Sequence, residues 1–380
     1  MLNETTSNSV SKVRWATFNT RSLLLTFFLR IPALALLAFI PASAQLPITW
    51  SDPVVLERAF SSWARMAQLS DGSWLAAYEV STVPNRIRIK RSFDRMRTWQ
   101  QVSEIIEDGR DLDNPSLCVL PNGVVEIAIR SVIMGQSYWI ETYRSADSGN
   151  SFQYQSQVDW DHHISGVFEP YLYLLPNGSL ACFYTNDTHV QDTPSYSQVL
   201  SEKISGDGGD TWGPEIFAIA QPGAARPGEA TIIPLPGDQL ALFFEMCGSE
   251  NCIGHVSYST DGVNWAGIGP VIPETIQNVQ VVLMDNGLIV ATSNLKEMVV
   301  STDFTNTWVD TRQYPFLNGA WPGIYQTGPN EFAVVFTGAG EHGEAGEYIR
   351  FGIIDAAALQ TAASGTVCRN PTRTRPQICY

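Results

Sequence analysis

The sequence predicts an all-β protein, a six-bladed β-propeller whose last blade is closed by a strand from the N-terminal part of the chain. Three observations lead to this fold class. Six β-hairpin patterns follow one another, a turn phrase of the form SxDxGxTW recurs between them, and 29 Gly with 22 Pro among 380 residues indicate many short elements joined by turns. With 44% hydrophobic residues, the chain can bury a large core.

Each hairpin pattern consists of an apolar run, a Gly-bearing turn and a second apolar run. Asn-Gly or Asp-Gly at the centre allows the positive φ angles of a tight turn, and the flanking runs are rich in β-branched, aromatic and leucine residues. The six segments are ARMAQLSDGSWLAAYE, NPSLCVLPNGVVEIAIR, EPYLYLLPNGSLACFYT, ARPGEATIIPLPGDQLALFFE, VQVVLMDNGLIVATSN and WPGIYQTGPNEFAVVFT. Four antiparallel strands at a period of about 40 to 60 residues describe one propeller blade, so six hairpins predict six blades.

The two ends of the domain predict how the ring closes. The last hairpin, Trp321–Thr337, is followed by one more strand pattern, YIRFGIID, and then by the Ala-rich AAALQTAASG. We therefore expect PVVLERAF, Pro53–Phe60, to supply the missing strand of the last blade, which would leave no open sheet edge.

The turn phrase indicates where chemistry is not located. Its five copies are Ser92–Trp99, Ser145–Phe152, Ser205–Trp212, Ser259–Trp265 and Ser301–Trp308, and Met96 and Thr305 replace the usual Gly in the first and the last. Its Ser and Asp can cap their own backbone, and its aromatic residue packs between strands. Strand directions place this phrase and the Gly turns at one end of the ring. The phrase is therefore scaffold, and we expect the functional site at the opposite end, the mouth.

Residues 1–44 have the features of a secretory signal peptide, and residues 45–380 form a single propeller domain. Basic residues precede the apolar run LLLTFFLRIPALALLAFI, and Ala42-Ser43-Ala44 offers a cleavage site of small residues. A membrane anchor is the alternative, but Arg30 and Pro32 interrupt the run. We expect a secreted, extracellular and monomeric protein that is not attached to a membrane after cleavage.

Charge and cysteine content limit the partners and the cofactors. The formal net charge is −15, and removing the leader with its four basic residues and one acidic residue would make it −18, so nucleic acid is excluded as a partner. Export permits disulfides: Cys247 with Cys252 and Cys368 with Cys379 can pair locally, whereas Cys118 and Cys182 are either buried thiols or a bridge. None of the six has metal-ligand company. We expect neither a metal nor an organic cofactor. The sequons at Asn177 and Asn186 are glycosylation candidates.

Strand register selects the residues at the mouth. Counting nine residues back from the turn glycine reaches Asn114 and Glu169, and counting seven or eight forward reaches Glu79, Arg130, Thr185 and Glu245. Glu169 and Glu245 would thus emerge from adjacent blades beside Arg130 and Arg226, and two carboxylates in one concavity are what glycoside hydrolysis requires. A strand-end Glu can also be a solvated or arginine-paired surface group. Glu79 competes for a role at the site, Glu229 is expected two or three residues deeper in a structural role, and His162-His163 is expected to line the mouth.

These motifs resemble a known family. The stretch FEPYLYLLPNGSLACFYTND, then PSYSQVLSEKISGDGGDTW, ARPG, FFEMCG and WPGIYQ is similar to glycoside hydrolase family 93, the fungal exo-α-1,5-L-arabinanases of the sialidase-like superfamily. The resemblance implies a retaining enzyme that releases arabinobiose from the non-reducing end of arabinan. It implies Glu169 as general acid/base and Glu245 as nucleophile. Tyr325 would be a supporting residue, and the expected substrate-binding set is Asn114, Arg130, Tyr184, Arg226, Trp321 and Tyr325.

Charge sets the expected roles of the two carboxylates. Phe168, Pro170 and a nearby Glu245 should raise the pKa of Glu169 so that it keeps its proton, while Arg226 or Arg130 should hold Glu245 ionised.

Two other functions remain open. A sialidase would need an arginine triad for the substrate carboxylate. The FLRIP motif of Phe28–Pro32 resembles a sialidase strand motif, but it lies in the leader. Arg65, Arg130 and Arg226 could form the triad instead. A non-catalytic carbohydrate-binding propeller would carry similar pockets between successive blades. Here the mouth residues Glu79, Arg130, Thr185 and Glu245 differ from blade to blade, which favours one central site.

Overall fold

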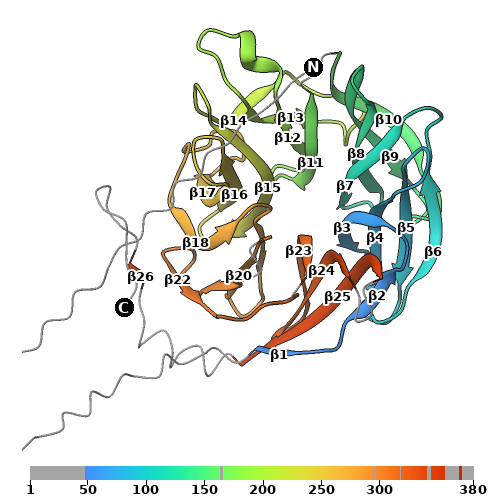
Figure 1. Cartoon of the computed structure of the whole chain (residues 1–380), viewed down its shortest axis with the longest axis vertical. Helices are drawn as coiled ribbons and strands as arrows, with labels where there is room; N and C mark the ends of the chain where they lie inside the picture. Colours follow the sequence, from blue (N-terminus) through green and yellow to red (C-terminus); the bar gives the residue numbers. More distant parts are fainter. Residues whose placement is uncertain are drawn as a thin grey trace, which may run out of the picture. The chain divides into compact units, whose positions relative to one another are not determined.

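The computed structural model describes residues 48–162, 166–294, 297–316, 318–339, 344–355 and 368–369. Within the compact unit Ser43–Tyr380, the described strands form six antiparallel sheets arranged around a common centre (Figure 1). Among these residues the single helical element is the 3₁₀ turn η1 (Thr188–Gln191), and no helix is long and apolar enough to cross a bilayer. The predicted all-β class and the six blades are confirmed.

The first four blades each have four strands in chain order, with the first strand innermost. Blade 1 contains β3 (Ser61–Gln68), β4 (Trp74–Val80), β5 (Arg86–Ser92) and β6 (Gln100–Ile105). Blade 2 contains β7 (Asp111–Val119), β8 (Val125–Ile133), β9 (Ser137–Ser145) and β10 (Gln153–Asp161). Blade 3 contains β11 (Val167–Leu174), β12 (Leu180–Asn186), β13 (Val199–Ser205) and β14 (Ile216–Ala220). Blade 4 contains β15 (Arg226–Leu235), β16 (Gln239–Cys247), β17 (Ile253–Ser259) and β18 (Val271–Ile276).

The last two blades contain strands that are distant in the sequence. Blade 5 contains β19 (Gln280–Leu283), β20 (Ile289–Thr292), β21 (Val299–Ser301) and β22 (Thr307–Asp310), and β26 (Cys368–Arg369) pairs with β22. Blade 6 contains β23 (Gly319–Gly328), β24 (Glu331–Ala339) and β25 (Ala345–Ile354). Its outer edge is formed by β1 (Ile48–Trp50) and β2 (Val54–Glu57), which both pair with β25. The segment Pro53–Phe60 thus contains a strand of blade 6.

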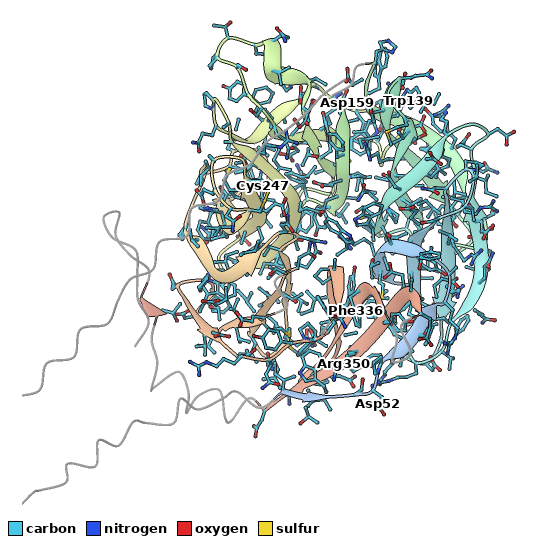
Figure 2. All side chains as sticks on the ribbon, viewed as in Figure 1. Asp52, Trp139, Asp159, Cys247, Phe336 and Arg350 are labelled. Carbon is cyan, nitrogen blue, oxygen red and sulfur yellow. A yellow bond between two sulfur atoms is a disulfide. The ribbon has the colours of Figure 1, made fainter. Side chains whose placement is uncertain are left out.

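The innermost strands form a closed ring. Contacts run from β3 to β7, β11, β15, β19, β23 and back to β3. Figure 1 labels β3, β7, β11, β15 and β23 around the centre. Apolar side chains fill the space between neighbouring blades; Leu75 and Ile87 of blade 1 pack with Ile127 of blade 2, and all three are 0% exposed. Side chains cover the whole ring in Figure 2. The blades are therefore held together by burial of both sheet faces.

All five turn phrases have the predicted capping contact. In each copy the Ser Oγ donates to the Oδ1 of the Asp two residues later, at 2.6 to 2.9 Å. Met96 and Thr305 take φ angles of 66° and 74°, so they adopt the left-handed conformation that Gly209 takes in the third copy. The two departures from the phrase therefore keep its shape.

The cysteine and sequon predictions had mixed outcomes. Cys247 and Cys252 form the expected disulfide, and Cys118 and Cys182 are free. Asn177 is exposed in a turn. Asn186 is 2% exposed and its amide donates to Glu215 at 2.9 Å, so this sequon is not an accessible glycan site in the folded protein. The signal peptide and Cys379, and with it the second proposed pair, lie outside the described residues.

Candidate active site

A ring of six residues surrounds the mouth, one from the start of each blade. We call this set the mouth ring: Trp63, Asn114, Glu169, Glu229, Asn278 and Trp321. All six have left-handed φ angles, between 45° and 57°. In the five blades other than blade 5, the residue lies in a β-bulge in which two residues of the innermost strand oppose one residue of the next strand. Asn278 precedes β19 by two residues, which is the same spacing to the resumed pairing.

The mouth ring corrects the expected position of Glu229. In the hairpin of blade 4, Leu235 pairs with Gln239, so the turn is shorter than in blade 3, where Leu174 pairs with Leu180. The count of nine residues back from Gly237 therefore ends one residue before the bulge residue, Glu229. Glu229 lies at the bulge of β15, where Glu169 lies in β11. The two carboxylates are therefore equivalent in register, and Glu229 is not deeper than Glu169.

The second strands place their mouth residues as the register predicted. Glu79, Arg130, Thr185 and Glu245 each pair with the residue just before the bulge of their own blade. Glu245 pairs with Gly228, and a Cβ on Gly228 would lie 3.2 Å from Oε2 of Glu169. Blades 3 and 4 therefore bring the carboxylates of Glu169, Glu229 and Glu245 into one cluster.

Glu169 is placed to keep a proton. Its side chain is half-buried. Burial raises its pKa well above the ordinary value, and the charges of Glu229 and then Glu245 raise it further, while Arg130 opposes the shift. The expected direction is confirmed, although Glu229 contributes more than the predicted Glu245.

Glu245 is held differently from the expectation. Its Oε2 accepts the backbone N–H of Asn278 at 2.6 Å, and burial followed by the charge of Glu229 raises its pKa to about 7. The two arginines predicted to hold Glu245 ionised are engaged elsewhere: Arg226 pairs with Asp187 at 3.0 Å and Arg130 with Asp113 at 3.1 Å. The prediction of an arginine partner for Glu245 was therefore wrong, because both arginines have nearer carboxylates of their own.

Glu229 is the most enclosed member of the cluster. It is 6% exposed, its Oε2 lies 3.9 Å from a guanidinium nitrogen of Arg65, and its Oε1 has no hydrogen-bond partner among the described residues. Burial raises its pKa and Arg65 lowers it. Arg65 also donates to the carbonyl of Trp321 at 3.4 Å. The pair of Arg65 and Glu229 thus connects the cluster to the opposite side of the mouth.

Of the other predicted substrate-binding residues, two belong to the mouth ring and two are arginines that pair with protein carboxylates. Asn114 lines the central pocket and Trp321 packs on Trp63, with both residues half-buried in the mouth ring. Arg130 is 13% exposed and packs on Phe168, with its carbon Cζ 4.4 Å from the ring centre. Arg226 is 40% exposed on the Asp187 side. Arg130 therefore supports the strand that carries Glu169.

Tyr184 and Tyr325 lie away from the rim. Tyr184 is 0% exposed because it is the single residue opposite the bulge of β11, and its hydroxyl donates to Asp159. It is a core residue, which corrects its assignment as substrate-binding. Tyr325 lies farther along the axis than the mouth ring, where its hydroxyl accepts the N–H of Met66 at 2.9 Å and lines the axial cavity.

Glu79 and the cysteines do not join the cluster. Glu79 is 5% exposed and accepts hydrogen bonds from Asn85 and Ser81 at 2.9 and 3.2 Å, between blades 1 and 2.

Glu245 lies close to the sulfurs of Cys247 and Cys252, which suggests a metal site by composition. Because these sulfurs are bonded to each other, they have no thiolate to offer a metal. Figure 2 labels Cys247 at the end of β16.

The cavities follow the axis. A pocket of about 20 Å³ beneath the mouth ring has room for a single water and is lined by Trp63, Asn114, Glu169 and Glu229. A cavity of about 700 Å³ continues toward the Gly-turn end, and Arg65 and Tyr171 line both spaces. The small pocket is too narrow for a sugar ring, and the large cavity lies on the Gly-turn side of the mouth ring.

The sequence analysis missed two mouth-ring residues. Trp63 and Asn278 are each nine residues before their turn glycines, Gly72 and Gly287, so the counting rule would have found them in blades 1 and 5. The position of Glu229 was predicted wrongly because no sequence signal shows that the hairpin of blade 4 has one additional residue pair.

The six sheets and the carboxylate cluster describe a six-bladed β-propeller with an acidic mouth. Comparison with solved structures finds the α-L-arabinanase of Penicillium chrysogenum complexed with arabinobiose, at 21% identity and a TM-score of 0.69, covering 80% of this chain and 98% of that one. The GH93 α-L-arabinofuranosidase of Fusarium graminearum with arabinobiose matches at 19% identity and a TM-score of 0.68, covering 80% and 97%. The NanB sialidase of Streptococcus pneumoniae matches at 11% and 0.58, covering 80% and 70%.

These likenesses establish the fold of the chain. They agree with the resemblance to glycoside hydrolase family 93 and to sialidase-like propellers that the motifs indicated. No protein-family model matches the sequence, and no curated protein matches it.

Proposed function

We propose that the protein is a secreted retaining exo-α-1,5-L-arabinanase of glycoside hydrolase family 93 that releases arabinobiose from arabinan. The observation that carries this proposal is the cluster of Glu169, Glu229 and Glu245, which blades 3 and 4 present at one mouth. Glycoside hydrolysis needs one carboxylic acid and one carboxylate at the scissile bond. The arabinobiose complexes of two structural neighbours support the choice of sugar.

In this proposal Glu169 protonates the leaving oxygen and Glu245 attacks the anomeric carbon. Both side chains are half-buried and open to the mouth. The C–O bond to the leaving sugar breaks as the ester bond to Glu245 forms. Glu169 gives its proton to the departing oxygen, then takes one from the water that hydrolyses the ester. The Asn278 N–H stabilises the carboxylate of Glu245.

Sialic acid is a less suitable substrate for this site. The three arginines available for a triad each face a protein carboxylate: Arg65 faces Glu229, Arg130 faces Asp113 and Arg226 faces Asp187. A substrate carboxylate would have to displace one of these partners. A neutral sugar meets no such competition.

The test compares two carboxylates that differ in exposure. Glu245→Gln should abolish release of arabinobiose from linear arabinan, because the attacking oxygen loses its charge while the side chain keeps its shape. Glu229→Gln should retain measurable turnover, since Glu229 is buried against Arg65. Trapping the intermediate with a slow fluorinated arabinoside and mapping the labelled peptide should place the sugar on Glu245. A label on Glu229, or full activity of Glu245→Gln, would assign the nucleophile elsewhere.

A further inference from the structure

We propose that the mouth ring is a binding subsite for a neutral sugar, in which Trp63 and Trp321 form a platform for the apolar face of the sugar and Glu169 binds its hydroxyl edge. This inference rests on the proposed function. It adds the chemistry of the substrate class and a specificity residue, Trp63, to that function.

Backbone conformation shows that these side chains are needed. A left-handed φ is costly for any residue with a Cβ, and glycine would take it without strain. All six mouth-ring positions are left-handed, and none of them is glycine. A bend alone would be made most cheaply by glycine, and Trp is poorly suited to this conformation. The chain therefore keeps strain here in exchange for side chains at the rim, as is typical of functional sites.

The order of residues around the ring creates two chemically different walls. Blade 1 lies opposite blade 4, and blade 6 lies opposite blade 3, because the six innermost strands form a closed ring. Trp63 therefore faces Glu229 across the mouth, and Trp321 faces Glu169. Asn114 and Asn278 stand between the two walls. One side of the mouth is thus aromatic and the other acidic.

The aromatic wall is a contiguous surface. The rings of Trp63 and Trp321 are 5.8 Å apart at an angle of 52°, and both side chains are half-buried. Trp63 lines the same pocket as Asn114, Glu169 and Glu229. The backbone of Trp321 is fixed by Asn294, whose Oδ1 accepts its N–H at 2.7 Å. A sugar ring has an apolar face of C–H groups and a rim of hydroxyls. The apolar face matches the aromatic wall, and the hydroxyls match the acidic wall.

The acidic wall and the neighbouring Asn278 have unused hydrogen-bonding capacity. Among the described residues, Oε1 of Glu229 and Nδ2 of Asn278 have no hydrogen-bond partner, although the two side chains are 6% and 0% exposed. Buried polar atoms in native proteins are nearly always bonded, so these atoms indicate a bound water or ligand hydroxyl. An anionic ligand would need an arginine to pair with, whereas Arg65, Arg130 and Arg226 each face a protein carboxylate. The occupant is therefore a neutral saccharide.

The experiment measures binding apart from catalysis. In a Glu245→Gln background, titration calorimetry with arabinobiose should show that Trp63→Ala raises the Kd about tenfold or more, through loss of the stacking surface. Trp63→Phe should recover part of the affinity. Phe93→Ala, which removes a 64%-exposed aromatic ring from a turn at the opposite end of the propeller, should leave the Kd unchanged.

The Trp63→Gly variant separates binding from folding. It removes the left-handed strain, so its melting temperature should stay within a few degrees of the parent or rise, while its affinity falls as far as that of Trp63→Ala. A merely structural Trp63 would give the reverse, a lower melting temperature with unchanged Kd, and would overturn the inference. Unchanged affinity in Trp63→Ala and Trp63→Phe would overturn it as well.

The outcomes also separate the inference from the proposed function. If arabinobiose fails to bind but another neutral disaccharide, such as xylobiose, binds in a Trp63-dependent way, the platform stands and the arabinan assignment fails. If arabinan is hydrolysed with equal KM by the parent and Trp63→Ala, the function stands and the platform fails. Preferential binding of sialyllactose would contradict the neutral-ligand inference.

Discussion

At the residue scale, the mouth holds a cluster of carboxylates in which, among the described residues, Arg65 is the arginine that pairs with a member. Arg65 is close to Glu229, and neither Glu169 nor Glu245 has an arginine within 4.0 Å among the described residues. After burial, the charge of Glu229 raises the pKa of both Glu169 and Glu245, and the charge of Glu245 raises that of Glu169 as well, so the protons on this cluster are shared and titrate together. Glu229 is central to this sharing because it acts on both of its neighbours.

Replacing Glu229 by Gln should shift the pH dependence of activity. Loss of its negative charge lowers the pKa of both Glu169 and Glu245, so the bell-shaped profile of kcat/KM should move toward lower pH. The profile is measured with arabino-oligosaccharide between about pH 3 and 8. Glu79→Gln is the matched control, because Glu79 is buried between blades 1 and 2, and its profile should match the parent. An unshifted profile for Glu229→Gln would show that its charge does not reach the reacting pair.

Glu169→Ala tests the assignment of the acid/base. An activated aryl arabinobioside has a leaving group that departs without protonation, so the variant should lose far more activity on arabinan than on this substrate. Azide should restore turnover by attacking the glycosyl-enzyme. The product should be the α-azide, because two inversions return the α configuration of the substrate. Recovery of the β-azide, or equal losses on both substrates without rescue, would contradict a double displacement through Glu169.

At the scale of the element, the hairpin and its bulge set the position of each functional group. The two-against-one bulge at the start of an innermost strand turns one side chain into the mouth and the residue opposite it into the core, as Glu169 and Tyr184 show. The turn phrase at the far end of the blade is independent of this arrangement. Its Ser and Asp bond to their own loop.

The third copy of the turn phrase offers a test of this separation. In Ser205→Ala, the buried N–H of Gly209, which bonds to Ser205 Oγ at 2.7 Å, loses its acceptor. The free energy of unfolding should fall by about 1 to 3 kcal/mol, the usual effect of a buried unpaired donor. Chemical denaturation measures the loss, and kcat on arabinan should not change. A large fall in kcat without loss of stability would place the phrase in the catalytic machinery.

At the scale of the whole molecule, buried acids between the blades couple stability to pH. Burial raises the pKa of Glu202 and Glu347 to about 8 and that of Glu126 to about 7. A raised folded-state pKa stabilises the protein fully below the ordinary value of about 4.5, and this stabilisation is lost as pH rises through 7 to 8. Asp147 acts in the opposite sense, since hydrogen bonds from Ser151 and Ser145 lower its pKa, and its contribution is lost in strong acid.

The melting temperature should therefore be highest near about pH 4 to 5 and fall toward pH 8. Differential scanning fluorimetry in matched ionic strength measures this. In Glu202→Gln the dependence should be shallower, because the amide carries no charge and can still accept from Trp265 Nε1, which lies 3.3 Å from Glu202 Oε2. A melting temperature that rises between pH 5 and 8 would be the contrary result.

The sequence by itself determined the architecture of the protein. Six hairpins with Gly turns and five capped turn phrases are local patterns, because alternating burial and positive-φ turns act over a few residues. They were enough to predict the six blades, the Cys247–Cys252 bridge and the register that brings Glu169 and Glu245 to the same mouth. The sequence also contained the signal for Trp63 and Asn278 in the same count of nine residues.

The tertiary structure alone decided which side chains meet. The strand register predicted that Arg130 and Arg226 would lie beside Glu245. Arg130 instead pairs with Asp113 and Arg226 with Asp187, because a guanidinium pairs with the nearest carboxylate in space. The length of the hairpin in blade 4 decided that Glu229 joins the cluster, since one additional pair moves every later residue by one position. The arrangement of an aromatic wall opposite an acidic wall exists only when the ring is closed, because it depends on residues from blades that are distant in the sequence.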